Sequence, residues 1–385
     1  MKNRTIDEAT QYFKDLLLEQ NDRVNKLSNQ PDWVNYLEKK KLTIGICWGD
    51  GIGETISNQA ERVLRHVLDG DIQSGRIFIN QIKGLTIENR AKHNAAIPDD
   101  VLSKLKTCDV ILKGPTTTPQ KGDGWPNIES ANVAMRRELD LFACVRPVKV
   151  PEKGIDWTFF RENTEGAYML GSKGIDMEGM SVDFKIISDP GADRIIRLAF
   201  EYAKNNGKKK VTVVTKSNVV KSTDGRFSEV AKEIAKEYVS DGIECDEWYI
   251  DIMTAKLIDE KRQTDFEVFV LPNLYGDILT DEASQIQGGV GTAGSANIGK
   301  QYAMFEAVHG SAPRMVEEGR AQYADPSSMI KAASMLLRHI GYVEPADQID
   351  AALEQTIQQP QFKMTGHSDG ASSDMLTEAI IQRLS

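Results

Sequence analysis

The sequence predicts an α/β protein in which helices cover a mainly parallel sheet. Short apolar runs of strand length alternate with longer segments of helical period along the 385 residues, which is the pattern of such folds. A chain of this length suits two or more lobes better than a single core. Gly49, Gly51 and Gly53 follow the first apolar run, but the dinucleotide-binding turn of a Rossmann fold needs the spacing G-x-G-x-x-G. The glycines therefore favour a tight strand-to-helix turn over a Rossmann fold.

The predicted elements follow in chain order. Apolar side chains recur at helical spacing from residue 4 onward and Pro31 interrupts them, so residues 1–40 are predicted to be a helical N-terminal extension. Apolar runs predict strands at 42–47, 110–112, 210–215 and 268–271, and periodic segments predict helices at 192–205 and 226–239. Residues 166–186 are rich in glycine and aspartate and show few periodic signals, which indicates a protruding arm.

Charge and hydropathy argue against several classes of function. The 57 acidic residues outnumber the 47 basic ones, and a net charge of −10 does not favour binding to nucleic acid or to an acidic membrane surface. No apolar run reaches the roughly 18 residues of a membrane span. The acidic start of the chain lacks the features of a secretory signal. The four cysteines lie far apart without a CxxC spacing, so reduced thiols in a cytoplasmic protein are expected.

Two aspartates four residues apart, Asp277 and Asp281, form a candidate metal site. If the segment after Gly276 is helical, both carboxylates lie on one face, where like charges repel unless a cation or a proton lies between them. A hard divalent ion such as Mg²⁺ prefers a few carboxylates and keeps room for water and substrate oxygens. The alternative is a solvated acidic face that binds no ion.

Three arginines, Arg136, Arg146 and Arg161, each follow the end of a predicted helix or strand. If they converge on one cleft, their planar guanidiniums bind a di- or tricarboxylate in a bidentate manner, whereas lysine offers only a point charge. Ser130 and Asn132 lie six and four residues before Arg136 and add polar groups. The alternative for each arginine is a surface ion pair.

Lys216 and Tyr168 are candidate proton-transfer groups. Lys216 follows the predicted strand 210–215, where partial desolvation lowers the pKa of a lysine toward the working pH. Either residue taken alone also suits a structural role. His309 lies in a glycine-containing loop, and no Ser/Asp or Cys/His pattern near it indicates a nucleophilic triad.

Seven blocks of the sequence resemble, in the same order, those of the β-decarboxylating dehydrogenases, the family of isocitrate and 3-isopropylmalate dehydrogenases. They are Gly49–Gly53, Lys113–Pro119, Ser130–Lys149, Phe160–Gly166, Lys216–Asn218, the stretch with Asp277 and Asp281, and the loop at His309. The resemblance implies an isocitrate/isopropylmalate dehydrogenase-like fold, with two lobes around a mainly parallel sheet and a short dimer arm. It divides the chain into residues 41–134 plus 288–385, a large cofactor-side domain, and residues 135–287, a small dimerisation and substrate domain.

The resemblance also implies a role for each candidate residue. The substrate carboxylates would be held by Lys113, Ser130, Asn132, Arg136, Arg146 and Arg161. Mg²⁺ or Mn²⁺ would be held by Asp251, Asp277 and Asp281, with Asp251 and Lys216 supplied by a neighbouring copy of the chain. Lys216 would help to deprotonate the substrate hydroxyl, and Tyr168 would protonate the enol carbon after CO₂ leaves. A site shared in this way implies a homodimer or a multiple of it.

Within the family, the segment Ser130–Arg136 is similar to the isocitrate type. In that type a serine and an asparagine hydrogen-bond the extra carboxylate, whereas apolar side chains hold the isopropyl group in the isopropylmalate type. Burying a carboxylate against apolar residues is unfavourable, so we expect the tricarboxylate isocitrate as substrate, with homoisocitrate or another 3-substituted malate as the alternative. A non-catalytic regulatory subunit is the alternative of another class. The presence of Tyr168, Lys216 and the three aspartates argues against it.

The expected cofactor is NAD, with NADP as the alternative. The resemblance implies contacts from Thr118, Asn218, His309, Gly310, Arg314 and Asp325. NAD-type members usually carry an aspartate after the His309 loop and bacterial NADP-type members carry Lys-Tyr, whereas this chain has Arg314 and Met315. An arginine there would attract a 2′-phosphate, together with Lys261 or Arg262 of a neighbouring copy. However, Phe362 and Gly366 stand where NADP-type members complete the phosphate clamp with Tyr and Arg.

Overall fold

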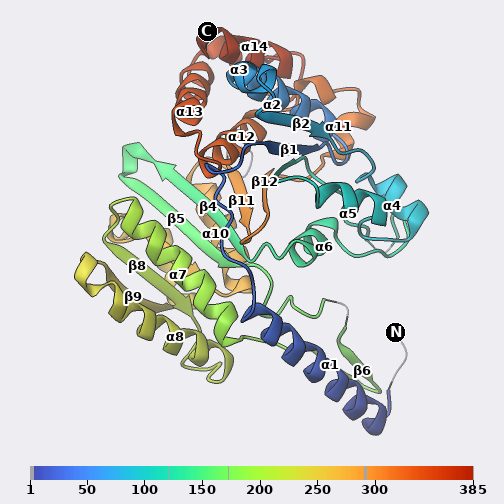
Figure 1. Ribbon diagram of the computed structural model, residues 1–385, viewed down its shortest axis with the longest axis vertical. Coiled ribbons are helices and arrows are strands. Elements are labelled where there is room, and N and C mark those ends of the chain that lie inside the picture. Colours follow the sequence, from blue (N-terminus) through green and yellow to red (C-terminus); the bar gives the residue numbers. More distant parts are fainter. Residues whose placement is uncertain (1–3, 121, 172, 290–292, 385) are drawn as a thin grey trace. The chain divides into compact units, whose positions relative to one another are not determined.

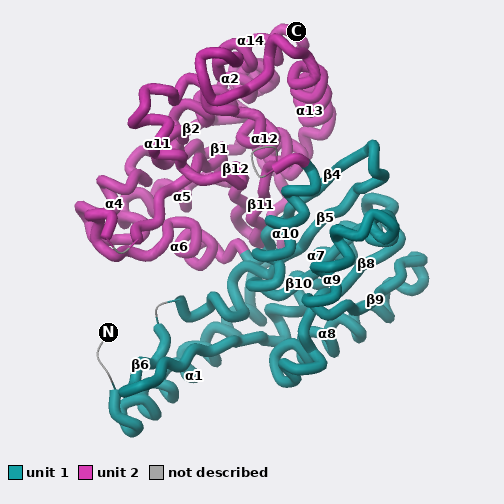
Figure 2. The backbone as a smooth tube through the Cα atoms, turned by 180° about the vertical axis from the view of Figure 1, so that it is seen from behind, with its two compact units in different colours: residues 1–32, 142–287 teal, residues 33–141, 288–385 magenta. Residues whose placement is uncertain are grey.

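The structure, a computed structural model, describes residues 4–120, 122–171, 173–289 and 293–384 (Figure 1). The chain divides into two compact units (Figure 2). Unit 1 comprises residues 1–32 and 142–287, and unit 2 comprises residues 33–141 and 288–385. The first three residues of the predicted N-terminal extension lie outside the described residues.

Unit 2 is built on five strands in the order β2, β1, β3, β12, β11. Their bounds are β1 Leu42–Cys47, β2 Ile77–Gln81, β3 Val110–Lys113, β11 Gly294–Ile298 and β12 Ala303–Ala307. Neighbouring strands are parallel except β11 and β12, which are antiparallel. The helices are α2 Gly53–Val67, α3 Asp69–Gln73, α4 Ile87–His93, α5 Asp99–Leu105, α6 Ala131–Glu138, α11 Pro313–Glu317, α12 Ser327–His339, α13 Val343–Ile357 and α14 Ser373–Leu384. A core cluster joins Ile111 and Met304 of the strands to Val101 of α5 and Met135 of α6.

Unit 1 is built on five strands in the order β4, β5, β10, β8, β9. Their bounds are β4 Ala143–Val150, β5 Ile155–Glu162, β8 Lys210–Thr215, β9 Glu244–Tyr249 and β10 Val268–Leu271. β4 and β5 are antiparallel, and the other neighbours are parallel. The helices are α1 Ile6–Leu27, α7 Asp189–Asn205, α8 Thr223–Glu237, α9 Ile250–Leu257 and α10 Asn273–Ile286. Trp157, Phe159 and Phe269 of the strands pack in one core cluster with Met253 of α9 and Leu279 of α10, and Figure 1 shows α7 and α8 in front of the same strands.

The structure confirms the α/β class and the predicted strands. β1, β8 and β10 have the predicted bounds, and β3 continues one residue further, to Lys113. α7 and α8 each begin three residues before the predicted helices. Ser188 caps α7 by accepting a hydrogen bond from the Gly191 N–H, so the Asp-Pro-Gly sequence that resembles a turn is the first turn of this helix. α1 ends at Leu27, and residues 28–40 of the predicted helical extension are not helical.

The predicted arm contains a short hairpin. β6 (Ile175–Met177) and β7 (Met180–Val182) pair in antiparallel fashion as a separate two-stranded sheet. α1 lies beside this hairpin (Figure 1), and the Arg4 N–H donates to the Asp176 carbonyl oxygen at 2.8 Å. The arm of unit 1 is therefore in contact with the N-terminal helix.

Among the described residues, the structure shows neither a disulfide nor a membrane-spanning helix. Cys47, Cys108, Cys144 and Cys245 form no disulfide. Burial raises the pKa of Cys47 to about 12, which keeps this thiol protonated and unreactive. In the described part of the chain, no helix is long and apolar enough to cross a membrane.

Candidate active site

The two predicted metal carboxylates, Asp277 and Asp281, both lie on α10, on one helical face. Asp277 Oδ1 accepts a hydrogen bond from Arg161 Nη1, and its Oδ2 accepts one from the Tyr168 hydroxyl at 3.0 Å. Asp281 Oδ1 accepts a hydrogen bond from Arg146 Nη1 at 3.0 Å. The structure thus places two predicted carboxylates, two predicted arginines and the predicted proton donor together in unit 1.

Arg161 is held in place before any ligand binds. Its side chain is only 2% exposed and extends from the end of β5. Asn273 Oδ1 accepts hydrogen bonds from Arg161 Nε at 3.0 Å and from Nη2 at 2.7 Å. Gly276 leaves room for the aliphatic part of the arginine, because a Cβ there would lie 2.5 Å from Arg161 Cγ. Asn273 and Gly276 were not predicted as site residues, and together they fix the direction of the guanidinium.

Gly276→Ala is expected to raise the Michaelis constant for an anionic substrate by about tenfold or more, because the added methyl group must displace Arg161 from Asn273 and Asp277. Gly225→Ala is the matched control: Gly225 is a helical residue of α8, and an added Cβ there meets no atom within 4 Å. The control should retain wild-type kinetics and gain slightly in thermal stability. Steady-state kinetics and thermal unfolding measure both effects. An unchanged Michaelis constant in a folded Gly276→Ala variant would contradict the position given to Arg161.

The Tyr168 hydroxyl is suited to donate a proton. Burial and then the Asp277 carboxylate raise the pKa of Tyr168, because both disfavour the phenolate. The phenol therefore stays protonated at neutral pH. Its side chain is 38% exposed, so the hydroxyl remains accessible to a ligand in the structure.

Lys216 and Asp251 form a second group in unit 1. Lys216 follows β8, and its backbone N–H donates to Asp224 Oδ2 at 2.8 Å. Its Nζ donates to Asp251 Oδ1 at 2.5 Å, and this hydrogen bond lowers the pKa of the Asp251 carboxyl. Asp251 lies in the first turn of α9. The two residues that the family resemblance assigns to a neighbouring copy of the chain are thus direct partners.

The acidic residues fit a hard divalent cation in type, but one chain does not gather three of them. Within the described ranges, no group of three or more His, Cys, Asp or Glu side chains is placed to hold a metal. The side chains of Asp251, Asp277 and Asp281 are between 38% and 67% exposed, so their oxygens are open to a ligand. One chain therefore offers two carboxylates of the predicted set on α10 and the third on α9.

In unit 2, the predicted residues Lys113 and Arg136 meet at Glu306, which the sequence analysis missed. Lys113 Nζ donates to Glu306 Oε2 at 3.2 Å, and Arg136 Nη2 lies 3.6 Å from Oε1. Asn297 Nδ2 donates to Oε1 at 2.7 Å. Burial alone would raise the pKa of Glu306, but Lys113 and Arg136 outweigh it and lower the pKa. The sequence does contain a signal for this residue: Glu306 is a charged residue inside the apolar strand β12, three residues before His309.

Ser130 and Asn132 lie at the start of α6. Ser130 is the N-cap residue, but its hydroxyl makes no capping hydrogen bond. Asn132 Oδ1 accepts a hydrogen bond from the Thr116 hydroxyl at 3.1 Å. Arg136 lies one turn further along; its Nε is buried and has no hydrogen-bond partner among the described residues. An unpaired buried N–H is unfavourable, so an anionic ligand is the partner that these groups fit.

The glycine loop after β1 is a tight turn, as its spacing favours. Gly49 and Gly51 have φ of +74° and +59°, and a Cβ at either would collide with the Pro115 or Ser311 carbonyl oxygen. The Asp50 N–H donates to the Pro115 carbonyl oxygen at 2.7 Å, and the Ile52 N–H donates to that of Ser311 at 2.9 Å. The turn thereby joins the block that begins at Lys113 to the loop that follows His309.

Several predicted cofactor residues lie at the surface of their unit. Thr118, Asn218 and Gly310 are exposed. His309 Nδ1 donates to the Gly310 carbonyl oxygen at 3.0 Å, and its Nε2 is buried without a hydrogen-bond partner in the part of the chain that the structure describes. A polar ligand such as a nicotinamide cofactor would satisfy this nitrogen.

Arg314 and Asp325, the remaining predicted cofactor contacts, already have partners within unit 2. Arg314 Nε donates to Glu318 Oε1 at 2.6 Å, and Arg320 Nε donates to Glu318 Oε2 at 2.7 Å. Asp325 Oδ1 accepts a hydrogen bond from the Ser327 N–H at 2.9 Å. The charge of Arg314 is therefore partly neutralised where a 2′-phosphate would have to bind.

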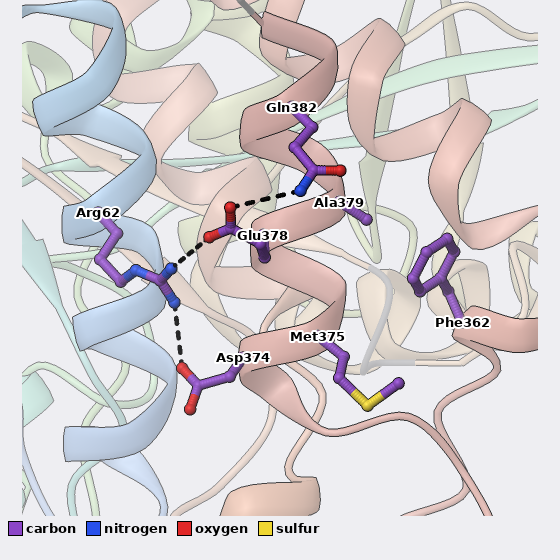
Figure 3. A pocket seen from close by; sticks show the side chains of 7 residues that line it. All are labelled: Arg62, Phe362, Asp374, Met375, Glu378, Ala379 and Gln382. Carbon is purple, nitrogen blue, oxygen red and sulfur yellow. Dashed lines mark hydrogen bonds and ion pairs between the residues drawn. The ribbon is translucent and has the colours of Figure 1, made fainter.

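A pocket of unit 2 lies outside the predicted site (Figure 3). Its lining residues are Arg62, Phe362, Asp374, Met375, Glu378, Ala379 and Gln382. Arg62 pairs with Asp374 at 3.0 Å and with Glu378 at 2.9 Å, so the charged groups of this pocket satisfy one another. None of the predicted site residues lines it.

Comparison with known proteins gives one family. The sequence profile of the isocitrate/isopropylmalate dehydrogenase family matches residues 43–384. The isocitrate dehydrogenase (NADP) of Rickettsia typhi is 38% identical over 353 residues, which cover 89% of this chain and 69% of that protein. A homoisocitrate dehydrogenase of Methanocaldococcus jannaschii is 37% identical, with 81% of this chain and 89% of that protein covered. Subunit 2 of the mitochondrial isocitrate dehydrogenase (NAD) of Schizosaccharomyces pombe is 35% identical, with 89% and 87% covered.

Solved structures give the same fold. The crystal structure of isocitrate dehydrogenase from Methylococcus capsulatus superposes with a TM-score of 0.76 at 33% identity, covering 89% of this chain and 99% of that one. The chain spans only about two thirds of the length of the rickettsial relatives, between 63% and 69% for those of R. typhi and Rickettsia bellii.

Proposed function

The chain belongs to the isocitrate/isopropylmalate dehydrogenase family, and from this premise we propose that it oxidatively decarboxylates isocitrate to 2-oxoglutarate and CO₂, with hydride transfer to a nicotinamide cofactor. One observation carries the proposal. Asp277 is bound on one oxygen by the buried Arg161 and on the other by the protonated Tyr168. These contacts support the proposal that Arg161 binds a substrate carboxylate, Asp277 a metal ion, and Tyr168 supplies a proton in one site.

The protein residues divide the chemistry among them. A bound Mg²⁺ or Mn²⁺, held by Asp277 and Asp281 with Asp251 of a second copy, would polarise the substrate 2-hydroxyl and its neighbouring carboxylate. Arg146 and Arg161 of unit 1 would bind substrate carboxylates and orient the hydroxy-acid. In unit 2, the unpaired Nε of Arg136 suits a carboxylate.

Two proton transfers complete the reaction. Lys216 would take the hydroxyl proton, and a bound nicotinamide cofactor would accept the hydride of the same carbon, which leaves a ketone. The bond between the carbon next to this ketone and its carboxylate would then break, so that CO₂ departs and the electron pair forms an enolate. Tyr168 would donate a proton to the enolate carbon and yield 2-oxoglutarate. The raised pKa of Tyr168 supports this role, because the phenol is protonated at neutral pH.

Two features support a homodimer with shared sites. Lys216 and Asp251 pair with each other, while Asp277 and Asp281 pair with arginines, and among the described residues no three His, Cys, Asp or Glu side chains are placed to hold a metal. The exposed Ile252 of α9 and Ile278 of α10 lie beside these acids in the sequence, and apolar side chains of this kind are suited to contact with a second copy. The four free thiols support the expectation of a reducing, cytoplasmic compartment.

Purified protein is expected to turn over isocitrate at least about tenfold more efficiently, by kcat/KM, than homoisocitrate or 3-isopropylmalate. The reason is that Ser130 and Asn132 offer a hydroxyl and an amide where an isopropyl group would need apolar contacts. The same assay with NAD and with NADP tests the cofactor. A higher kcat/KM for homoisocitrate would favour the second candidate, which the similarity to the M. jannaschii enzyme supports. No turnover of any of the three would favour a regulatory subunit.

We propose NAD as the oxidant. Arg314 is bound by Glu318, whose negative charge disfavours a 2′-phosphate, and Phe362 has no hydroxyl to complete a phosphate clamp. NADP is the second candidate, because the R. typhi relative carries that name. A kcat/KM for NADP above that for NAD would overturn the choice.

A further inference from the structure

The N-terminal helix α1 lies outside the family match, which begins at residue 43, yet it is built into unit 1. Phe13 stacks on Phe184, with ring centroids 4.8 Å apart. Lys173 Nζ donates to Glu19 Oε1 at 2.7 Å, and the Tyr12 hydroxyl donates to the Lys173 carbonyl oxygen at 3.2 Å. These contacts place α1, whose C-terminal half carries Glu19, against the segment that follows β5.

From that half of α1, Arg23 reaches a fully buried carboxylate. Arg23 Nη2 donates to Glu165 Oε1, and the Glu165 side chain is 0% exposed. Glu165 Oε2 also accepts a hydrogen bond from the Ser188 N–H at 2.9 Å, at the N-terminus of α7, where a negative charge is favoured. A Cβ at Gly191 would collide with the Glu165 carboxyl group. The position is thus closely fitted to a carboxylate and leaves Glu165 little freedom to move.

A continuous series of hydrogen bonds leads from Glu165 to the candidate active site. Asn273 Nδ2 donates to the Glu165 carbonyl oxygen at 3.0 Å. The other end of the same amide, Asn273 Oδ1, accepts from Arg161 Nε and Nη2. Arg161 in turn donates to Asp277, which accepts from Tyr168. Each partner in this series contacts the next, and Arg23 contacts the first of them, Glu165.

The charges around Glu165 show why a cation is needed there. The Glu165 N–H donates to Glu162 Oε2 at 2.5 Å, so two buried glutamates are neighbours. Burial and then the charge of Glu165 raise the pKa of Glu162 to about 7. Among the described residues, the cations with hydrogen bonds toward this pair are Arg23 of α1 and Arg194 of α7, and Arg194 reaches Glu162 through the Thr164 hydroxyl. Without Arg23, one guanidinium would have to balance two buried carboxylates.

We propose that Arg23 is a positioning residue for substrate binding: by pairing with Glu165 it holds the segment 161–168 in the geometry in which Arg161 binds a substrate carboxylate and Tyr168 donates a proton. The role of α1 is thus to complete the support of the active site from outside the part of the chain that the family profile matches. This inference rests on the proposed function for the roles of Arg161 and Tyr168. The contacts that place Arg23 do not depend on it.

The first test is the kinetics of Arg23→Ala, Arg23→Lys and Glu19→Gln on isocitrate with Mg²⁺. Arg23→Ala is expected to lower kcat/KM by about 10- to 100-fold, mainly through a higher Michaelis constant, because Arg161 loses its support. Arg23→Lys keeps the charge and should lose less. Glu19→Gln removes another ion pair of the same helix and should match wild type. Equal kinetics for Arg23→Ala and Glu19→Gln would overturn the proposal.

The second test is the pH profile of kcat/KM, which a merely stabilising contact would not alter. At low pH Glu162 holds its proton, and Arg194 then faces less negative charge. As pH rises past neutral Glu162 loses this proton, and without Arg23 the added negative charge is not balanced. The ratio of variant to wild-type kcat/KM should therefore fall as pH rises. Replacing Glu165 as well, in Arg23→Ala/Glu165→Gln, should remove this pH dependence. A ratio that does not change with pH would count against the charge argument.

Hydrogen–deuterium exchange separates this inference from the proposed function. Backbone exchange in residues 161–168 of the full-length, ligand-free protein should be faster in Arg23→Ala than in wild type, and unchanged in Glu19→Gln. This measurement needs no substrate, so it remains informative if wild-type protein turns over none of the three hydroxy-acids. Equal exchange in wild type and Arg23→Ala would refute the positioning role, whereas inactivity of the wild type would refute only the proposed function.

Discussion

Lys216→Met is expected to lower kcat by about two to four orders of magnitude, which is the usual contribution of a positioned acid–base group. Methionine fills much the same space as lysine but cannot accept or donate a proton. The fold should survive, because the lysine side chain is 24% exposed and its ion pair is with the exposed Asp251. Steady-state kinetics at saturating isocitrate and metal, together with circular dichroism and thermal unfolding, measure the two effects separately.

Lys210→Met is the matched control for this variant. Lys210 begins β8 and Lys216 follows it; the side chains are 25% and 24% exposed, and each pairs with one aspartate. The control variant should keep wild-type kinetics and change the free energy of unfolding by less than about 1 kcal/mol. Substantial residual activity in folded Lys216→Met would remove lysine from the proposed mechanism.

The same variant also tests the shared site. In the proposed dimer, one copy contributes Lys216 to a site and the other copy contributes Asp277. Lys216→Met and Asp277→Asn therefore change residues that come from different copies. When the two inactive proteins are unfolded and refolded as a mixture, a mixed dimer would hold one site with both lesions and one intact site. Recovery of about a quarter of wild-type activity is expected with random pairing. If no activity returns although mixed dimers form, Lys216 and Asp277 act within one chain.

The sequence alone predicted the structural features that depend on neighbouring residues in the chain. The apolar runs at 42–47, 210–215 and 268–271 are strands with those bounds, because a buried parallel strand needs an unbroken apolar run. The prediction that Asp277 and Asp281 share one helical face was also correct, because a spacing of four residues within one helix is a local feature. The start of α7 was misjudged, because proline and glycine signal a turn unless a cap such as Ser188 makes them the first turn of a helix.

Features caused by contacts between distant segments were not predictable in this way. Glu306 meets Lys113 across 193 residues, and Asn273 meets Arg161 across 112. Arg23 reaches Glu165 across 142 residues, from a helix that lies before the part of the chain that the family profile matches. A charged residue in an apolar strand, as at Glu306, indicates that a buried partner exists but does not identify it. The pairing of α10 aspartates with arginines likewise follows from the fold rather than from spacing.

Asp277→Asn is expected to weaken the binding of Mn²⁺ or Mg²⁺ by about two orders of magnitude or more, since a neutral amide replaces an anionic oxygen ligand in a site that has few ligands. The amide keeps the size of the side chain, and its oxygen can still accept a hydrogen bond from Arg161. The loss should therefore appear in metal affinity more than in stability. Titration with Mn²⁺ in the presence of isocitrate, followed by the signal of the free ion, measures affinity without turnover.

Asp265→Asn is the control that separates the loss of a metal ligand from the loss of an ion pair. Asp265 pairs with Arg262 as Asp277 pairs with Arg161, and the two aspartate side chains are 39% and 38% exposed. A general effect of removing an arginine-bound carboxylate would appear in both variants, whereas loss of a metal ligand would appear in Asp277→Asn alone. Because Asp277 also contacts Tyr168, kcat should remain low in Asp277→Asn even when added metal is raised far above the wild-type requirement. If folded Asp277→Asn binds the metal with the affinity of wild type, Asp277 is not a metal ligand. The two aspartates of α10 would then form only an ion-paired acidic face, which is the alternative stated for their spacing.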